Sequence, residues 1–112
     1  MGTIRETLGE ITVVRAGPGT LGRRSSEELG RELAALSGPG TLVVIDLSRV
    51  DGIDEAGCGA ILAHQRRLSG QGGRLHVCGL SRSVRLLFLL LCIHRRLEVF
   101  NTEYEAIEAF RQ

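Results

Sequence analysis

The sequence predicts a single α/β domain over residues 1–112. Its mostly parallel central sheet has four to five strands with one antiparallel edge strand, and helices pack against the sheet. Short β-branched apolar stretches alternate along the chain with stretches of helical period. The 112 residues suffice for one core but not for two. The expected order is β-β-α-β-α-β-α-β-α, with right-handed crossovers between the parallel strands.

The first strands are expected to form a hairpin. Residues 3–8 and 11–14 are strand candidates separated by a turn at 9–10, and their pairing supplies the antiparallel edge. Residues 42–47 form a continuous apolar run, which is typical of a central parallel strand covered on both faces. Residues 48–53 are predicted to be a loop.

Along the chain, one helix is expected before that central strand and one after it. Ser25 and Glu28 have the spacing of a capping box, so the first helix should begin near Ser25. It should end at the Ser-Gly-Pro-Gly stretch 37–40. The second helix is expected over 55–69, with Leu68 among its inward residues and the glycine-rich stretch after it as its end.

The last elements repeat the alternation. Residues 75–78 are a short strand candidate, and Ser81 is placed to cap a helix over 82–91. Residues 97–100 predict a final strand. Thr102 should cap a last helix with acidic residues in its first turn, where the helix dipole favours negative charge.

Composition argues against several classes of function. The formal net charge is +1, so no global field attracts nucleic acid or an anionic membrane. No apolar run reaches the ~20 residues that a spanning helix needs, so membrane insertion is not expected. The cysteines (58, 78 and 92) are odd in number and lack metal-ligand spacing, which favours a reducing cytoplasm. No cofactor, metal site or catalytic set is predicted.

The most informative stretch is 43–59, where an apolar strand is followed by a loop and then a helix start. Loops at the carboxyl ends of parallel strands are common binding sites. Asp54 is placed to cap the free N–H groups of the helix. Gly57 and Gly59 leave the helix start nearly bare, so we expect the backbone of a partner to approach closely there.

This stretch resembles the signature of the STAS domain family, named for sulphate transporters and anti-sigma factor antagonists. The matching residues are Ile-Asp-Leu-Ser at 45–48 and Ile-Asp-Glu-Ala-Gly-Cys-Gly at 53–59. The resemblance continues through Gly72-Gly73, the strand and helix over 75–91, and Glu105-Ala106. It implies an anti-sigma factor antagonist that binds an anti-sigma factor, often a serine kinase, and thereby frees a sigma factor.

The chain departs from that pattern in two places. In the family the small residue before the first Gly can be phosphorylated, but here it is Ala56, which has no hydroxyl. An earlier Gly-x-Leu-Asp element ends in Gly22, so its acidic residue is missing. We therefore expect docking to persist without a phosphorylation switch at Ala56.

The predicted function is a non-enzymatic binding module that docks on an anti-sigma factor or a serine-kinase-like protein through the loop and helix start at 51–67. The apolar run 86–93 is expected to be partly exposed, adding to a docking surface or to a homodimer contact. The predicted partner-binding residues are Asp54, Glu55, Ala56, Gly57, Gly59, His64, Arg66 and Arg67.

Two other functions stay open from the sequence alone. The first is a STAS subunit of a lipid-transport ABC ATPase complex. Some such subunits also lack the phosphorylatable serine, so Ala56 fits them as well. The second is an enzyme, which is disfavoured because no nucleophile–base–acid set or metal cluster is evident. A neighbouring gene for an ABC ATPase would favour the lipid-transport reading.

Overall fold

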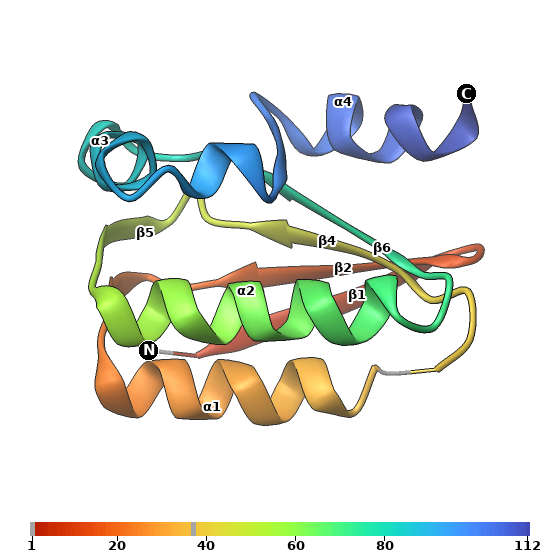
Figure 1. The fold of residues 1–112 in the computed structure, drawn as a ribbon, viewed down its shortest axis with the longest axis horizontal. Coiled ribbons are helices and arrows are strands. Elements are labelled where there is room, and N and C mark those ends of the chain that lie inside the picture. Colours follow the sequence, from red (N-terminus) through yellow and green to blue (C-terminus); the bar gives the residue numbers. More distant parts are fainter. Residues whose placement is uncertain (1, 37) are drawn as a thin grey trace.

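The computed structural model describes residues 2–36 and 38–112. Met1, and Ser37 in the expected stop of the first helix, lie outside the described residues. A five-stranded sheet has the order β1-β2-β4-β6-β7, with β1 and β2 antiparallel and the other neighbours parallel (Figure 1). The predicted mostly parallel sheet with one antiparallel edge is confirmed. Its strands are β1 (Thr3–Leu8), β2 (Ile11–Ala16), β4 (Leu42–Asp46), β6 (Arg74–Cys78) and β7 (Glu98–Phe100).

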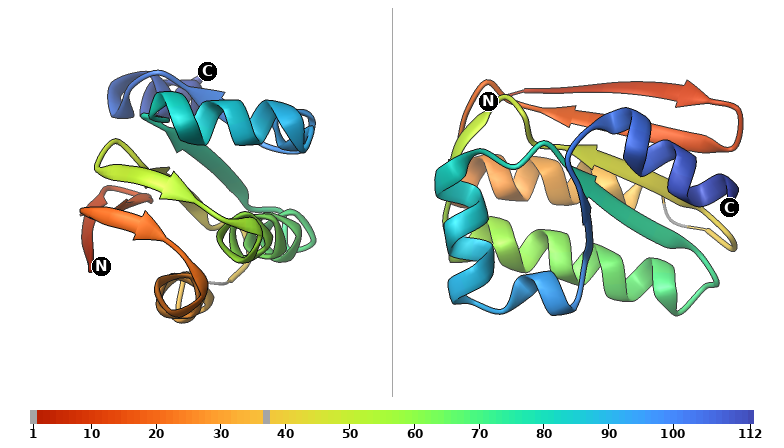
Figure 2. Two further views of the ribbon diagram at one scale, coloured as in Figure 1. Left: turned by 90° about the vertical axis from the view of Figure 1, so that its left-hand side faces the viewer. Right: turned by 90° about the horizontal axis from the view of Figure 1, so that it is seen from above.

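Four α-helices surround this sheet. Figures 1 and 2 show α1 (Arg23–Ala34) and α2 (Glu55–Ser69) side by side on one face. On the opposite face, α4 (Glu103–Glu108) continues into the short 3-10 helix η2 (Ala109–Arg111). At one corner, α3 (Arg82–Leu90) is followed by the 3-10 helix η1 (Ile93–Arg95).

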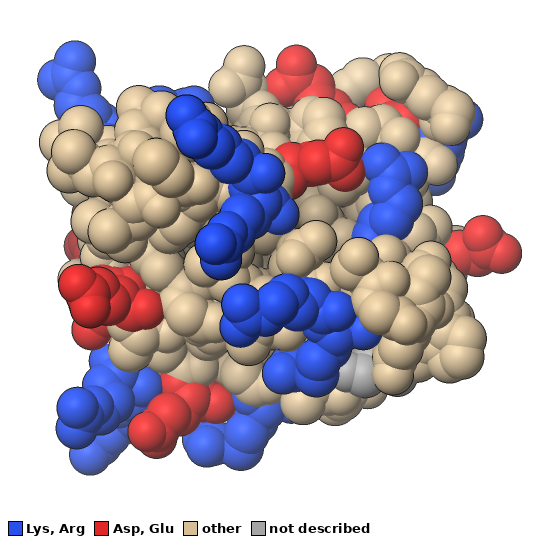
Figure 3. All heavy atoms as spheres, viewed as in Figure 1, with Lys and Arg blue, Asp and Glu red and all other residues tan. Residues whose placement is uncertain are grey.

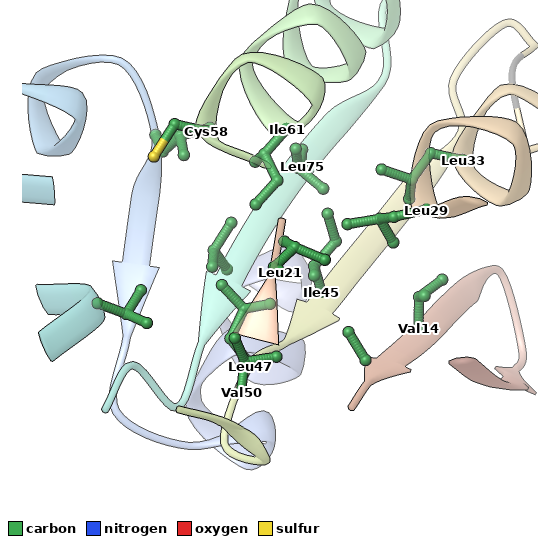
Figure 4. Packing of buried hydrophobic residues seen from close by; sticks show 14 of the residues in the cluster. Val14, Leu21, Leu29, Leu33, Ile45, Leu47, Val50, Cys58, Ile61 and Leu75 are labelled. Carbon is green, nitrogen blue, oxygen red and sulfur yellow. The ribbon is translucent and has the colours of Figure 1, made fainter. Parts of the chain in front are cut away.

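The central strand β4 is buried on both faces, as its continuous apolar run predicts. Val43, Val44 and Ile45 are all 0% exposed. Val43 and Ile45 pack in the larger core with Leu29 and other helix residues (Figure 4), whereas Val44 belongs to a smaller core beneath α4. Alternate residues of one strand therefore fill two cores, which requires apolar side chains at successive positions.

The predicted loop at 48–53 is wrong in its second half. Residues Val50–Ile53 form strand β5, which pairs in parallel with the three-residue strand β3 (Gly19–Leu21) in a separate two-stranded sheet. Glycine and aspartate in these segments disfavour strand by propensity, so the local sequence gives no strand signal. The pairing arises from tertiary packing and places the starts of α1 and α2 next to each other.

The expected capping box of the first helix is also wrong. The helix begins at Arg23 with Gly22 as the N-cap, two residues earlier than expected. Ser25 is the third helical residue, and its Oγ accepts the backbone N–H of Gly22 at 2.9 Å. The pairing of β3 ends at Leu21, so the chain turns into the helix at once and Ser25 stabilises that turn.

Side-chain contacts fix α4 to the sheet. Arg15 donates to both carboxylate oxygens of Glu103 at 2.6 and 2.9 Å, and this guanidinium lowers the pKa of Glu103 to about 2. The buried ring of His76 lies 2.8 Å from the Ala106 carbonyl and 2.9 Å from a Glu98 carboxylate oxygen. The Arg15–Glu103 contact therefore ties α4 to β2, and the His76–Ala106 contact ties it to β6.

Helix α3 presents one buried and one exposed apolar face. Val84 and Phe88 are buried in the larger core at 0% and 1% exposure. Four leucines of the same apolar run, at 86, 89, 90 and 91, remain exposed. The expected mixture of burial and exposure in the 86–93 run is therefore confirmed.

Truncation at the two faces of α3 should have unequal effects on stability. Phe88→Ala should lower the free energy of unfolding by about 3–5 kcal/mol, because it opens a cavity in the core. Leu90→Ala should change it by less than about 0.5 kcal/mol, because Leu90 is 70% exposed. Urea unfolding followed by circular dichroism measures both variants, and equal losses would contradict the packing of α3 described here.

Candidate functional site

The start of α2 is held by one hydrogen bond within its own first turn and by another to strand β3. Asp54 is the N-cap, and its Oδ1 accepts the Gly57 N–H at 2.9 Å, as the sequence predicts. The Asp54 N–H donates to the Leu21 carbonyl of β3 at 3.1 Å. The cap is thereby tied to its own helix and to the strand that leads into α1.

Gly57 lies against the protein rather than open to a partner. A Cβ there would lie 2.6 Å from Cγ1 of Ile53 and 2.9 Å from the carbonyl oxygen of Leu21. The expectation that Gly57 bares the helix start for a partner is therefore wrong, because its missing side chain lets α2 pack on β5 and β3. Gly59 differs, since it is exposed and a Cβ there would meet no atom within 4 Å.

Ala56 is exposed and opens onto a groove between α1 and α2. The groove has a volume of about 420 Å³ and is lined by Arg23, Ser26, Glu27, Gly30, Ala56 and Ala60. A larger hollow of about 570 Å³ lies between β1 and α1, away from Ala56. The proximity of α1 to Ala56 follows from the β3–β5 pairing, which the sequence pattern did not predict.

Ser26 is the one residue of this groove with an unusual polar environment. Its side chain is 3% exposed, and within residues 2–36 and 38–112 its Oγ has no hydrogen-bond partner. A buried hydroxyl without a partner costs free energy, so a group that bonds to it would be favoured. The charged side chains of Arg23 and Glu27 flank it at the rim, and Glu55 is exposed next to Ala56.

His64, which was predicted to bind a partner on the exposed face of the second helix, is buried instead. His64 is 0% exposed, and its spacing from Ile61 and Leu68 places all three on the inward stripe. Its Nδ1 lies 3.3 Å from the Arg67 guanidinium, and its Nε2 has no partner within the described residues. Burial, with a smaller effect of the Arg67 charge, lowers the pKa of His64 to about 4.

The remaining predicted residues divide into two groups along α2. Asp54 and Glu55 are exposed at its start, near Ala56. Arg66 and Arg67 are exposed in its last turn, where positive charge suits the helix dipole. The helical rise separates them from Ala56 by about 15 Å, so only a partner that covers most of α2 contacts both groups.

Cys58 is part of the core and not of the surface. It is 3% exposed and points from α2 towards the sheet, in the cluster that Figure 4 labels. Burial raises the pKa of its thiol to about 11, and the Asp54 and Glu55 carboxylates add to the effect. The thiol is thus held protonated at neutral pH, where a thiolate would be needed for redox chemistry.

In residues 2–36 and 38–112, no helix has both the length and the apolar content needed to cross a membrane. Across the same ranges, His, Cys, Asp and Glu side chains form no group of three that could hold a metal ion.

Comparison with known proteins identifies a family and several similar structures. The sequence model of the family described as "Mlab, STAS domain" matches residues 7–99. No curated protein sequence matches the chain. An anti-sigma-factor antagonist (STAS) domain protein from Planctomyces limnophilus aligns with a TM-score of 0.89 and 19% identity, covering 98% of both chains.

Two further solved structures have the same fold. An anti-sigma factor antagonist from Mycobacterium paratuberculosis aligns with a TM-score of 0.86 and 22% identity, covering 99% of this chain and 94% of that one. The anti-sigma factor antagonist SpoIIAA, a Bacillus protein, in its unphosphorylated form aligns with a TM-score of 0.79 and 20% identity, covering 98% and 96%.

The two glycines at the start of α2 should respond oppositely to alanine. Gly57→Ala should lower the free energy of unfolding by about 1–3 kcal/mol, because the new methyl group overlaps Ile53 and the Leu21 carbonyl. Gly59→Ala should raise it by up to about 1 kcal/mol through helix propensity. Chemical unfolding of the two variants makes the comparison, and a stabilised Gly57→Ala protein would refute the inward packing.

The buried His64 should make stability depend on pH. Its folded pKa lies below the unfolded value of 6.5, so the unfolded state takes up the proton first as the pH falls. Its contribution should therefore decline from about pH 6.5 down to about pH 4, by about 2 kcal/mol between pH 7 and pH 5. Urea unfolding at both pH values should show a smaller drop for His64→Leu than for the original chain.

The exposed His94 provides the control for this pH experiment. A His94→Leu variant should keep the full drop in stability between the two pH values. Equal pH dependence of the His64→Leu variant and the original chain would contradict the role given to His64.

Proposed function

Because this chain belongs to the STAS domain family, we propose that it is a regulatory binding module that docks onto an anti-sigma factor or a serine-kinase-like protein. The module performs no catalysis and acts in the cytoplasm by occupying the surface of its partner. The similar solved structures named as anti-sigma factor antagonists support this class of function. The docking surface is the start and outward face of α2 with the adjoining start of α1.

The observation that carries the proposal is the exposure of Ala56 at the rim of the α1–α2 groove. A small side chain at the start of a well-capped helix leaves a rigid surface with an accessible groove, which a partner can cover with little loss of side-chain entropy in this chain. Asp54 contributes by holding the helix start in place. Glu55, Gly59 and the rim of the groove complete the contact area.

Docking through this surface is not controlled by phosphorylation at position 56. Alanine has no hydroxyl to receive a phosphate. The structurally similar protein SpoIIAA, in contrast, has solved structures of both a phosphorylated and an unphosphorylated form. A phosphate at a tight interface adds a charge of about −1.5 to −2 and disrupts it by repulsion and desolvation. Without that switch, binding is set by the amount of partner or by control elsewhere on the chain.

The second candidate is a STAS subunit of a lipid-transport ABC ATPase complex. It places the same α2 surface against an ATPase, and Ala56 suits it equally because no phosphate switch is needed there. The two candidates differ in the partner, so binding to purified proteins separates them.

Ala56→Glu should weaken binding to the partner by roughly tenfold or more, because the new carboxylate would lose its water in the centre of the contact. Tyr104→Glu is the matched control, since Tyr104 is 72% exposed on α4 across the sheet and should leave binding unchanged. Calorimetric titration with the serine-kinase-like protein or the ABC ATPase of the same organism measures both. Equal affinities of the two variants would contradict the proposed surface.

Ala56→Ser should restore a phosphorylation site if the partner is a kinase of the family type. Incubation with that kinase and ATP should add phosphate to the Ala56→Ser protein at position 56 and leave the original chain unmodified. Mass spectrometry reads the outcome. Phosphate on the original chain, with loss of binding, would show that another residue acts as the switch.

A further inference from the structure

The exposed apolar side chains of this protein are concentrated on and just after α3. We call Leu86, Leu89, Leu90 and Leu91 the leucine patch; they are 57%, 52%, 70% and 44% exposed. None of them is needed for the core, which α3 reaches through Val84 and Phe88. A contiguous apolar surface of this kind usually marks a binding site.

Positive charge surrounds the leucine patch without any negative charge in the same segment. Residues 81–97 contain four arginines, at 82, 85, 95 and 96, and no Asp or Glu. All four are exposed, and within the described part of the chain no ion pair joins any of them to a carboxylate. Figure 3 shows the uncharged area over α3, in the upper left, with blue side chains on both sides and red side chains of other segments below it.

The arrangement of α3 mixes the two kinds of side chain on one outward face. Arg82, Leu86 and Leu90 are spaced four residues apart and therefore lie along one line of the helix. Arg85 and Leu89 form a second line beside it. The arginines occupy the first turn of the helix and the leucines the later turns, and the second pair of arginines follows beyond the patch.

We propose that the leucine patch and its four arginines bind the surface of an anionic lipid bilayer. Leucines on a convex helix face enter the boundary between headgroups and acyl chains, and arginines around them pair with lipid phosphates. Each feature alone binds weakly, and their coincidence on one exposed element adds an apolar and an electrostatic contribution. The association is interfacial, so it needs no spanning helix.

Charge and shape favour a bilayer over a second copy of this chain. A two-fold contact through α3 would bring eight arginines together with no carboxylate of the same segment between them, which is repulsive. A protein partner would need a groove that is both acidic and matched in shape to a protruding corner (Figures 1 and 2). An anionic bilayer supplies negative charge and an apolar layer that adapts to any convex shape.

The basic character of this surface is not evident from the net charge of the chain. The formal net charge is only +1, so no attraction is expected from the molecule as a whole. The structure gathers basic residues of one segment around exposed leucines, and attraction at a membrane acts within about a Debye length of the surface. The inference is independent of the proposed function, since β5 separates α3 from the start of α2 in Figure 1.

The test is sedimentation of the full chain with lipid vesicles. Vesicles of phosphatidylcholine mixed with phosphatidylglycerol should bind the chain, those of phosphatidylcholine alone should not, and added salt should weaken binding. Arg82→Ser with Arg85→Ser should reduce partitioning about 30-fold, the loss expected for two arginines near an anionic surface. The double variant Leu86→Ser with Leu90→Ser should reduce partitioning by roughly tenfold or more, because apolar contact with the bilayer is lost.

Matched substitutions away from α3 serve as controls. Arg5→Ser with Arg24→Ser removes the same charge, and Ile4→Ser removes an apolar side chain that is 53% exposed. Both controls should bind vesicles as the original chain does. All substituted positions are exposed, and circular dichroism confirms that each variant is folded.

Cys92 offers a second readout at the edge of the patch. It is exposed, whereas Cys58 and Cys78 are buried, so a polarity-sensitive fluorophore attaches selectively at Cys92. Its emission should shift to shorter wavelength with anionic vesicles only.

Three outcomes would overturn the proposal. The chain could fail to bind anionic vesicles, or it could bind them equally well with both pairs of α3 substitutions. The leucine substitutions could instead convert a dimer into a monomer in light scattering, without vesicle binding by the original chain, which would assign the patch to a second copy.

Discussion

The packing of Gly57 against β5 and β3 is the constraint on which the candidate site depends. A side chain at this position would occupy the space of Ile53 and the Leu21 carbonyl, so α2 can begin only where a residue without a Cβ meets the two strands. The Asp54 N–H donates to the same carbonyl and fixes the distance between them. Because α1 follows β3 and α2 follows β5, the two helices start together, and Ala56 is directed into the groove between them.

Neighbouring residues at the start of α2 therefore have different roles. Asp54 and Gly57 hold the geometry through contacts within the chain, whereas Ala56 and Gly59 face outward and determine what can approach. A regulatory protein that acts by surface occupation needs this rigidity, since a mobile helix start would lose entropy on docking. The leucine patch on α3 lies on another part of the surface, so the proposed protein contact and the proposed lipid contact are separate.

Much of the fold could be predicted from sequence, because it rests on local patterns. The apolar run 42–47 predicted a strand covered on both sides, and the buried Val43, Val44 and Ile45 confirm it. The pairing of β3 and β5 could not be predicted, since two very short strands rich in glycine carry no propensity signal and form only in the tertiary structure. The start of α1 was misplaced for the same reason.

At the candidate site, the sequence prediction was right for the helix cap and wrong for the positions of two residues. Asp54 was correctly identified as the cap, because that role depends only on the adjacent backbone. Gly57 was assigned to the partner because sequence does not tell which side of a helix a missing side chain faces. His64 was assigned to the partner-binding surface, although its spacing from Ile61 and Leu68 already indicated the buried stripe. No sequence pattern pointed to Ser26, because its place in the groove depends on the packing of α1 beside Ala56 of α2.

The central claim is that a partner covers the starts of α1 and α2 together. Amide chemical shifts of the isotope-labelled chain, recorded by NMR as the purified partner is added, test it most directly. The account predicts the largest changes at Glu55, Ala56, Gly59 and Ala60 on α2 and at 23–27 on α1. Changes confined to β1, α4 or the leucine patch, with the start of α2 unaffected, would contradict it.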